Sequence, residues 1–101
     1  MPDKRWHAFF YINRKKTVMI TLEDFQYATF EEKCDVVASG SDYLTVRSLG
    51  DCKIYLYHTG RFFIEVYYSR AHKKVLLINA FDSMSELTPY ADMVSLSDLN
   101  L

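Results

Sequence analysis

The residues of this chain that could carry out nucleophilic or metal chemistry are few, and they are widely separated in the sequence. The two cysteines, Cys34 and Cys52, do not have a Cys-x-x-Cys spacing. The three histidines, His7, His58 and His72, do not have the short spacing typical of a zinc site on a helix. We therefore expect no metal, no cofactor and no catalytic residue, and we expect that the protein is not an enzyme.

Cys34 and Glu65 are the two candidates for a reactive side chain. Cys34 falls on the apolar face of a predicted helix, where a cysteine usually packs as an inert apolar group. Glu65 is surrounded in sequence by aromatic residues, where burial could prepare a carboxylate for general-base chemistry. The predicted strand pairing sets Lys53 opposite Glu65, however, and a cross-strand ion pair is the simpler account of this carboxylate.

The composition indicates one folded domain that spans residues 1–101. Half of the residues are apolar and 16% are aromatic, whereas disordered chains are poor in such residues. The formal net charge is −1, so no basic excess favours a nucleic acid or an anionic membrane as partner. No apolar stretch reaches the length of a signal-peptide core or of a membrane span. We expect a cytoplasmic protein with reduced thiols.

A helix is predicted after Thr29. Thr29 and Glu32 have the spacing of a capping box, in which the two residues satisfy each other's backbone N–H groups. Gly40 is expected to end the helix in a left-handed conformation. The apolar residues that follow the cap at i, i+4 and i+7 form one face: Phe30, Cys34 and Val37.

Four β-patterned runs follow this helix, at residues 43–49, 52–57, 61–68 and 74–81. Because the connections are short, successive strands must be antiparallel. The predicted fold class is α+β, with one helix packed on an antiparallel meander of four strands (residues about 43–81) and one or two additional N- or C-terminal strands.

The two ends of the chain have weaker patterns. Residues 17–22 alternate as a strand does, residues 6–12 fit a strand or a short helix, and residues 92–96 fit a short edge strand. Ser83 and Glu86 have the spacing of a second capping box, and Pro89 is expected to limit that helix to about one turn.

The register of the meander decides which residues share a face. A three-residue loop at residues 58–60 pairs Ile54 with Ile64, and a similar loop at residues 49–51 pairs Val46 with Ile54. Gly60 then takes the left-handed position of its loop. The predicted core face is Leu44, Val46, Cys52, Ile54, Leu56, Phe62, Ile64 and Val66, with Leu76 and Ile78.

The opposite face of the predicted sheet is rich in aromatic residues and therefore unlike a solvated face. Tyrosine and arginine are enriched at protein interfaces. Three alternatives remain for what covers this face: the chain's own ends, a second copy that forms a homodimer, or a separate partner or ligand. The candidate partner-binding residues on this face are Arg47, Tyr55, Tyr57, Arg61, Phe63 and Tyr67.

Two resemblances bear on function. Residues 60–67 are similar to the aromatic sheet motif of RNA-recognition domains, but Phe62 stands where that motif has a small residue, so we do not expect nucleic-acid binding. The order of one helix and four strands is similar to cystatin-type layouts, which implies binding of a ligand or partner on a curved sheet. Our first hypothesis is a small intracellular interaction module, adaptor-like or self-associating, that uses the aromatic face. The alternative is a small-molecule binding domain with a pocket near Arg47, Tyr55 and Glu65.

Overall fold

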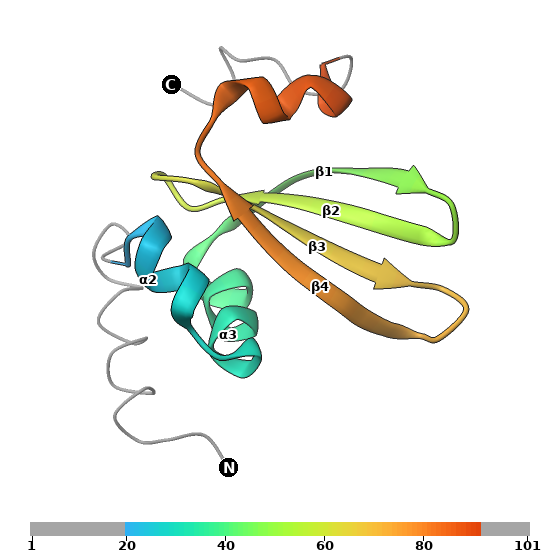
Figure 1. Ribbon diagram of the computed structural model, residues 1–101, viewed down its shortest axis with the longest axis horizontal. Helices are drawn as coiled ribbons and strands as arrows, with labels where there is room; N and C mark the ends of the chain where they lie inside the picture. The colour runs from blue at the N-terminus through green and yellow to red at the C-terminus, as the bar shows by residue number, and fades with distance from the viewer. Residues whose placement is uncertain (1–19, 92–101) are drawn as a thin grey trace.

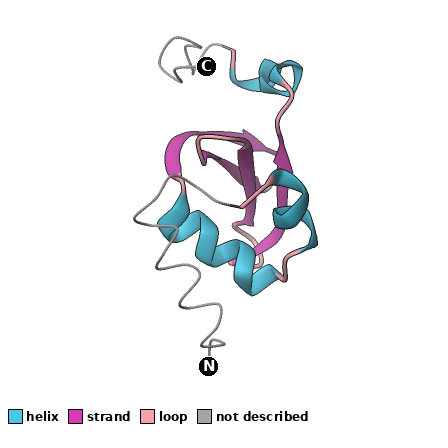
Figure 2. Cartoon of the chain, turned by 90° about the vertical axis from the view of Figure 1, so that its left-hand side faces the viewer, coloured by secondary structure: helices cyan, strands magenta, loops and turns pink. Residues whose placement is uncertain are grey.

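The computed structural model describes residues 20–91, and these residues form an α+β fold (Figure 1). The four strands are antiparallel neighbours in chain order, which confirms the predicted meander. Figures 1 and 2 show the two α-helices on one side of the sheet and a 3-10 helix on the other. In chain order the elements are α2 (Leu22–Tyr27), α3 (Phe30–Gly40), β1 (Asp42–Leu49), β2 (Cys52–His58), β3 (Phe63–Ser69), β4 (Lys74–Phe81) and the 3-10 helix η1 (Met84–Tyr90).

The predicted capping box starts helix α3. The Glu32 N–H donates to Thr29 Oγ1 at 3.1 Å, and the Thr29 N–H donates to Glu32 Oε1 at 2.9 Å. The left-handed ending at Gly40 was wrong, since positive φ angles among the described glycines occur at Gly50 and Gly60. Ser41 is extended instead, and its hydroxyl donates to the Val37 carbonyl at 2.8 Å. This bond satisfies a terminal carbonyl while the chain runs directly into β1.

Helix α2 replaces the C-terminal end of the strand predicted at residues 17–22. Thr21 caps α2 by accepting the Asp24 N–H at 3.0 Å, and the helix buries Phe25 completely. A helix of six residues depends on such packing, because short helices are marginal by themselves. Residues 17–19, the strand or short helix predicted at residues 6–12 and the edge strand predicted at residues 92–96 lie outside the described part of the chain.

The second predicted helix is present as η1. Ser83 caps it by accepting the Ser85 N–H at 3.3 Å. It extends over seven residues and contains Pro89, so it is longer than the single turn expected. Pro89 lies near its C-terminal end, and the Tyr90 and Leu87 side chains are buried.

The β2–β3 register differs from the predicted one by three residues. His58 pairs with Phe63, and Ile54 faces Tyr67 instead of Ile64. Since successive side chains of a strand point to opposite faces, an odd shift moves Ile54 to the face opposite Ile64. The loop is longer than expected because Phe62 leaves the strand to enter the core.

Thr59 and Gly60 shape this longer loop. The Thr59 hydroxyl accepts the backbone N–H groups of Arg61 and Phe62, both at 3.2 Å. The Thr59 N–H donates to the Phe62 carbonyl at 3.0 Å. Gly60 has a φ of 99°, the positive value predicted for it. These bonds close a loop of residues 59–62 in place of the three-residue loop.

The β1–β2 hairpin also has a different register. Leu49 pairs with Cys52 across a two-residue turn in which Gly50 has a φ of 57°. As a result Arg47, and not Val46, lies opposite Ile54. An irregularity in the ladder at Leu44 lets this side chain pack beside the cluster that contains Leu56.

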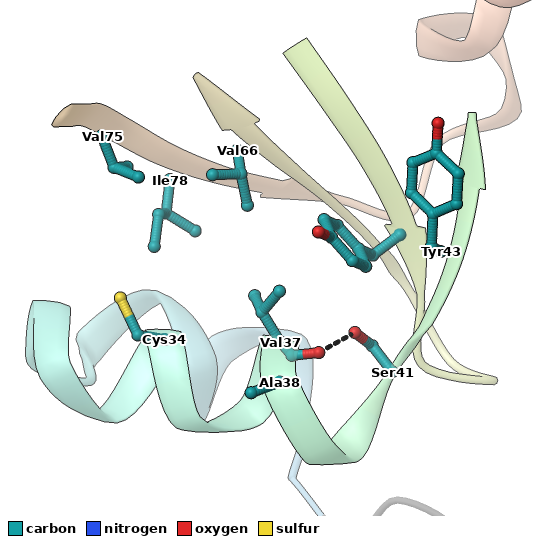
Figure 3. Close-up of a pocket in the computed structure, with 9 residues that line it drawn as sticks. Cys34, Val37, Ala38, Ser41, Tyr43, Val66, Val75 and Ile78 are labelled. Atoms are coloured by element: carbon teal, nitrogen blue, oxygen red, sulfur yellow. Dashed lines mark hydrogen bonds between the residues drawn. The ribbon is translucent and has the colours of Figure 1, made fainter. Parts of the chain in front are cut away.

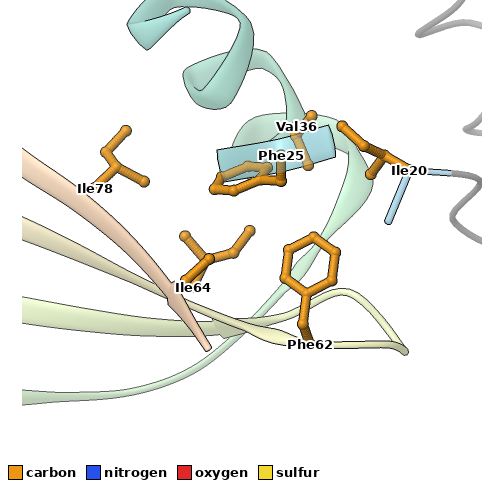
Figure 4. Close-up of a cluster of buried hydrophobic side chains, with 7 residues drawn as sticks. Ile20, Phe25, Val36, Phe62, Ile64 and Ile78 are labelled. Carbon is orange, nitrogen blue, oxygen red and sulfur yellow. The ribbon is translucent and has the colours of Figure 1, made fainter. Parts of the chain in front are cut away.

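Both faces of the sheet carry buried apolar residues, and the residues predicted to share one core face are divided between them, with Ile64 on one side and Leu56 on the other. Figure 4 shows the cluster on the α2–α3 side. The buried residues of that cluster are Ile20, Phe25, Val36, Phe62, Ile64, Ile78 and Ala80. The buried residues on the η1 side are Leu56, Phe63, Phe81, Leu87 and Tyr90. No helix within residues 20–91 is long and apolar enough to cross a membrane.

Acidification is expected to destabilise the fold in part through His58. Its ring packs on Phe63 with 4.6 Å between centroids, and burial lowers its pKa below 6.5 although Asp42 acts in the opposite direction. Neutral His58 therefore makes its full contribution to the free energy of unfolding above about pH 6.5. This contribution is lost as the pH falls through the lowered pKa of His58 in the folded state. Urea denaturation at about pH 8 and about pH 5 should show a smaller loss for His58→Gln than for the wild type. Equal losses would contradict this assignment.

Candidate functional site

A pocket of about 480 Å³ lies between α3 and the sheet (Figure 3). This volume is within the range of about 300–1,000 Å³ that is usual for small-molecule sites. Its walls are largely apolar, and none of the lining side chains is charged at neutral pH. The lining residues are Cys34, Val37, Ala38, Ser41, Tyr43, Tyr57, Val66, Val75 and Ile78.

The pocket exists because the part of α3 that faces the sheet carries short side chains. Val36 is anchored in the buried cluster, whereas the large Phe30 side chain is 53% exposed and fills no space under the helix. Figure 3 shows Cys34 and Val37 pointing from α3 toward the strands, and with Ala38 they line the helix side of the pocket. The strands therefore form one wall and the helix forms the other.

The two ends of the pocket differ in chemistry. Figure 3 shows Cys34 below Val75 at one end, and Tyr43 and Ser41 at the other. Burial raises the pKa of the Cys34 thiol, with further increases from Asp35 and Glu31. Cys34 is therefore protonated at neutral pH and is a weak nucleophile.

The tyrosine end is built by the first pair of strands. Tyr43 and Tyr57 lie opposite each other on β1 and β2, with 5.8 Å between ring centroids and 69° between ring planes. Tyr55 lies further along β2, with its centroid 6.4 Å from that of Tyr43. Burial raises the pKa of Tyr57, and Tyr43 and Tyr55 raise it further. The Tyr57 hydroxyl therefore stays a hydrogen-bond donor at neutral pH.

A buried polar cluster occupies the opposite face of the sheet, beneath η1. Glu65 is 5% exposed and is at its centre. Its Oε2 accepts the Tyr90 hydroxyl at 2.6 Å and lies 3.5 Å from Arg47 Nη2. Its Oε1 accepts from Asn79 Nδ2 at 3.1 Å and from the Tyr67 hydroxyl at 3.5 Å. Both carboxylate oxygens are thus occupied.

The arrangement around Glu65 is suited to holding η1 on the sheet and not to acid–base catalysis. The Arg47 guanidinium lies over the Tyr90 ring, 5.0 Å from its centroid. Burial and the hydrogen bond to Glu65 raise the pKa of Tyr90 well above its usual value. The predicted pair between Lys53 and Glu65 was wrong, because the shifted register sets Lys53 opposite Tyr68.

The residues predicted to form one aromatic surface are distributed over two faces and a loop. Tyr55 and Tyr57 belong to the α3 side, where Tyr57 lines the pocket. Arg47, Phe63 and Tyr67 belong to the η1 side, and Phe63 is only 2% exposed. Arg61 is exposed in the β2–β3 loop. Of the three residues expected around the alternative pocket, Arg47 and Glu65 lie close together, but Tyr55 is on the other face of the sheet.

A sequence signal for the pocket exists, and the helix prediction did not use it. Cys34, Val37 and Ala38 follow one another at i, i+3 and i+4, so short side chains share one face of α3, and Ser41 comes directly after the helix. Within residues 20–91 no group of three or more histidine, cysteine, aspartate or glutamate side chains could hold a metal ion.

Comparison of the chain with protein-family models, with curated proteins and with solved structures finds no match in any of the three.

Proposed function

We propose that the protein binds a small, largely apolar molecule in the pocket between α3 and the sheet. The observation that carries the proposal is a 480 Å³ pocket with valine and isoleucine walls. Filling such walls removes apolar surface from water, which contributes about 25 cal/mol for each Å² buried. The walls belong to regular elements, so little conformational entropy is lost when a ligand enters.

The few polar groups of the pocket orient this ligand. Ser41 and Tyr43 lie at one end and Cys34 at the other. Tyr57 also lines the pocket, with its ring centroid 5.8 Å from that of Tyr43. Tyr43 is 54% exposed, so this end is open to solvent. The apolar part of the ligand lies along β3 and β4, and its polar part lies at the tyrosine end.

A pocket-filling substitution tests the proposal. Val75→Trp places a large ring in the pocket and should weaken binding of the neutral fluorescent probe N-phenyl-1-naphthylamine by about tenfold or more. The matched control is Leu77→Trp on the same strand, because Leu77 is on the η1 side and 53% exposed. The control should bind the probe as the wild type does, and both variants should show the wild-type circular dichroism spectrum. No fluorescence increase with the wild type, or equal binding by both variants, would contradict the proposal.

A protein-interaction module in the cytoplasm is the second candidate function. It is supported by large apolar side chains that are exposed around the α2–α3 junction, where Tyr27 is 84% and Phe30 53% exposed. Cys34 and Cys52 are both free thiols, as is usual in a reducing compartment. Light scattering across a dilution series tests self-association, and a monomeric mass at all concentrations would contradict the homodimer.

A further inference from the structure

We propose that the ligand of this pocket is an amphipathic cation, whose ammonium group lies at the Tyr43–Tyr57 end and whose apolar body lies against β3 and β4. This inference rests on the proposed function and adds the charge of the ligand. Three features of the described residues support it: the tyrosine rings, the C-terminal end of α3, and the charges around the pocket.

The tyrosine rings form a corner that suits an alkylated ammonium group. The near-perpendicular planes of Tyr43 and Tyr57 meet at 5.8 Å between centroids. The face of an aromatic ring carries partial negative charge, and rings set at an angle bind quaternary ammonium ions from two directions. Backbone pairing of β1 with β2 holds the two residues opposite each other, so their backbone positions are fixed before the ligand arrives.

Helix α3 ends at the same end of the pocket. The C-terminal carbonyls of a helix carry a partial negative charge of roughly half an electron, which favours a cation nearby. The last turn of α3 contains no basic residue that would neutralise it. The Ser41 hydroxyl donates to the Val37 carbonyl at 2.8 Å, and Ser41 itself lines the pocket.

The charges near the pocket oppose an anionic ligand. At the Cys34 end, burial and then the nearby Asp35 and Glu31 carboxylates raise the pKa of the thiol, so a negative charge is disfavoured there. Asp42 precedes Tyr43, but it pairs with His58 on the η1 face of the sheet and therefore points away from the pocket. Lys74 precedes Val75 on β4, but neighbouring residues of a strand point to opposite faces, and Lys74 is not among the lining residues. A buried carboxylate would therefore meet no cation in the pocket.

A quaternary ammonium fits this site better than a primary one. A primary ammonium is strongly hydrated and needs hydrogen-bond acceptors to replace its water. Methyl groups around the nitrogen weaken this hydration and so reduce the free-energy cost of removing the water. The apolar walls and ring faces offer contacts to methyl groups. The expected ligand is thus a hydrophobic amine, most favourably one with a trimethylammonium head.

A series of three ligands with one phenylbutyl body tests the charge. The heads are trimethylammonium, its uncharged tert-butyl isostere, and carboxylate, and each ligand is titrated against N-phenyl-1-naphthylamine bound to the wild type. We expect the ammonium ligand to displace the probe at about tenfold lower concentration than the isostere, with the carboxylate weakest. Tyr43→Leu should abolish this preference while the isostere still binds. Tyr27→Leu, on an 84% exposed side chain of α2, is the control and should retain the preference.

The possible results separate the two proposals. Equal displacement by the ammonium ligand and its isostere would overturn the cation while leaving the apolar binding site in place. A preference that persists in Tyr43→Leu would overturn the assignment of the ammonium group to the tyrosine corner. If neither the probe nor any of the three ligands binds the wild type, both the cation and the proposed function are wrong.

Discussion

Phe25→Ala is expected to lower the free energy of unfolding by about 3–5 kcal/mol. The Phe25 side chain is fully buried, and its ring centroid lies 5.4 Å from that of Phe62. Its removal leaves a cavity at the point where α2, α3 and the β2–β3 loop meet. Because α2 is only six residues long, it has few other contacts with which to close the cavity. Urea denaturation followed by circular dichroism measures the loss.

Two further variants keep this prediction testable if Phe25→Ala does not fold. Phe25→Leu preserves most of the volume and should cost about 1–1.5 kcal/mol. Tyr27→Ala is the matched control on the same helix, and since Tyr27 is 84% exposed it should change stability by no more than about 0.5 kcal/mol. Similar losses for Phe25→Leu and Tyr27→Ala would show that α2 does not contribute to the core in this way.

Elements were predicted correctly where the interaction that defines them joins residues only a few positions apart in the sequence. Thr29 and Glu32 located the start of α3 because a capping box is a contact between neighbours. Thr21 caps α2 by accepting the Asp24 N–H, but the prediction for residues 17–22 used only their alternation. The helix is stabilised by the tertiary contact of Phe25 with Phe62, and a local sequence pattern does not reveal such a contact.

The register could not be predicted because both faces of the sheet are covered. Apolar pairing selects a register only when one face is solvated, and here Ile54 and Ile64 are both fully buried on opposite faces. The deciding feature is the Thr59 hydroxyl, which closes a loop one residue longer than expected. The odd register differences in both hairpins, β1–β2 and β2–β3, also distributed the predicted aromatic surface over two faces.

The pocket was missed for a related reason. The pocket is the space between α3 and the sheet that the helix side chains leave empty. Its other wall is formed by strands whose faces were predicted incorrectly. Val66 and Ile78 were predicted to lie under the helix, and they do line the pocket. Tyr57 was placed on the opposite face, so its contribution to the tyrosine end of the pocket was not predicted from the sequence.

Glu65→Leu is expected to lower the free energy of unfolding by about 3–5 kcal/mol. The substitution removes the acceptor of the Tyr90 hydroxyl and of Asn79, and it leaves Arg47 without its carboxylate. Arg47 is 18% exposed and its Nε has no partner, so water compensates for only part of its charge. Tyr90→Phe removes only one hydrogen bond to a charged acceptor and should cost about 1.5–3 kcal/mol. Guanidinium denaturation of each variant checks the order of these losses.

The double variant Glu65→Leu/Arg47→Met separates the cost of an unpaired charge from the value of the ion pair. An unpartnered buried charge is expensive, while replacing both partners with apolar groups of similar size is often close to neutral. We therefore expect the double variant to be more stable than Glu65→Leu alone, by about 1–3 kcal/mol. The remaining loss measures the hydrogen bonds of Tyr90 and Asn79. The single variant Arg47→Met completes the cycle. If its loss and that of Glu65→Leu simply add, Arg47 and Glu65 are not coupled, and η1 is held on the sheet by Leu87 and the Tyr90 ring without a contribution from the ion pair.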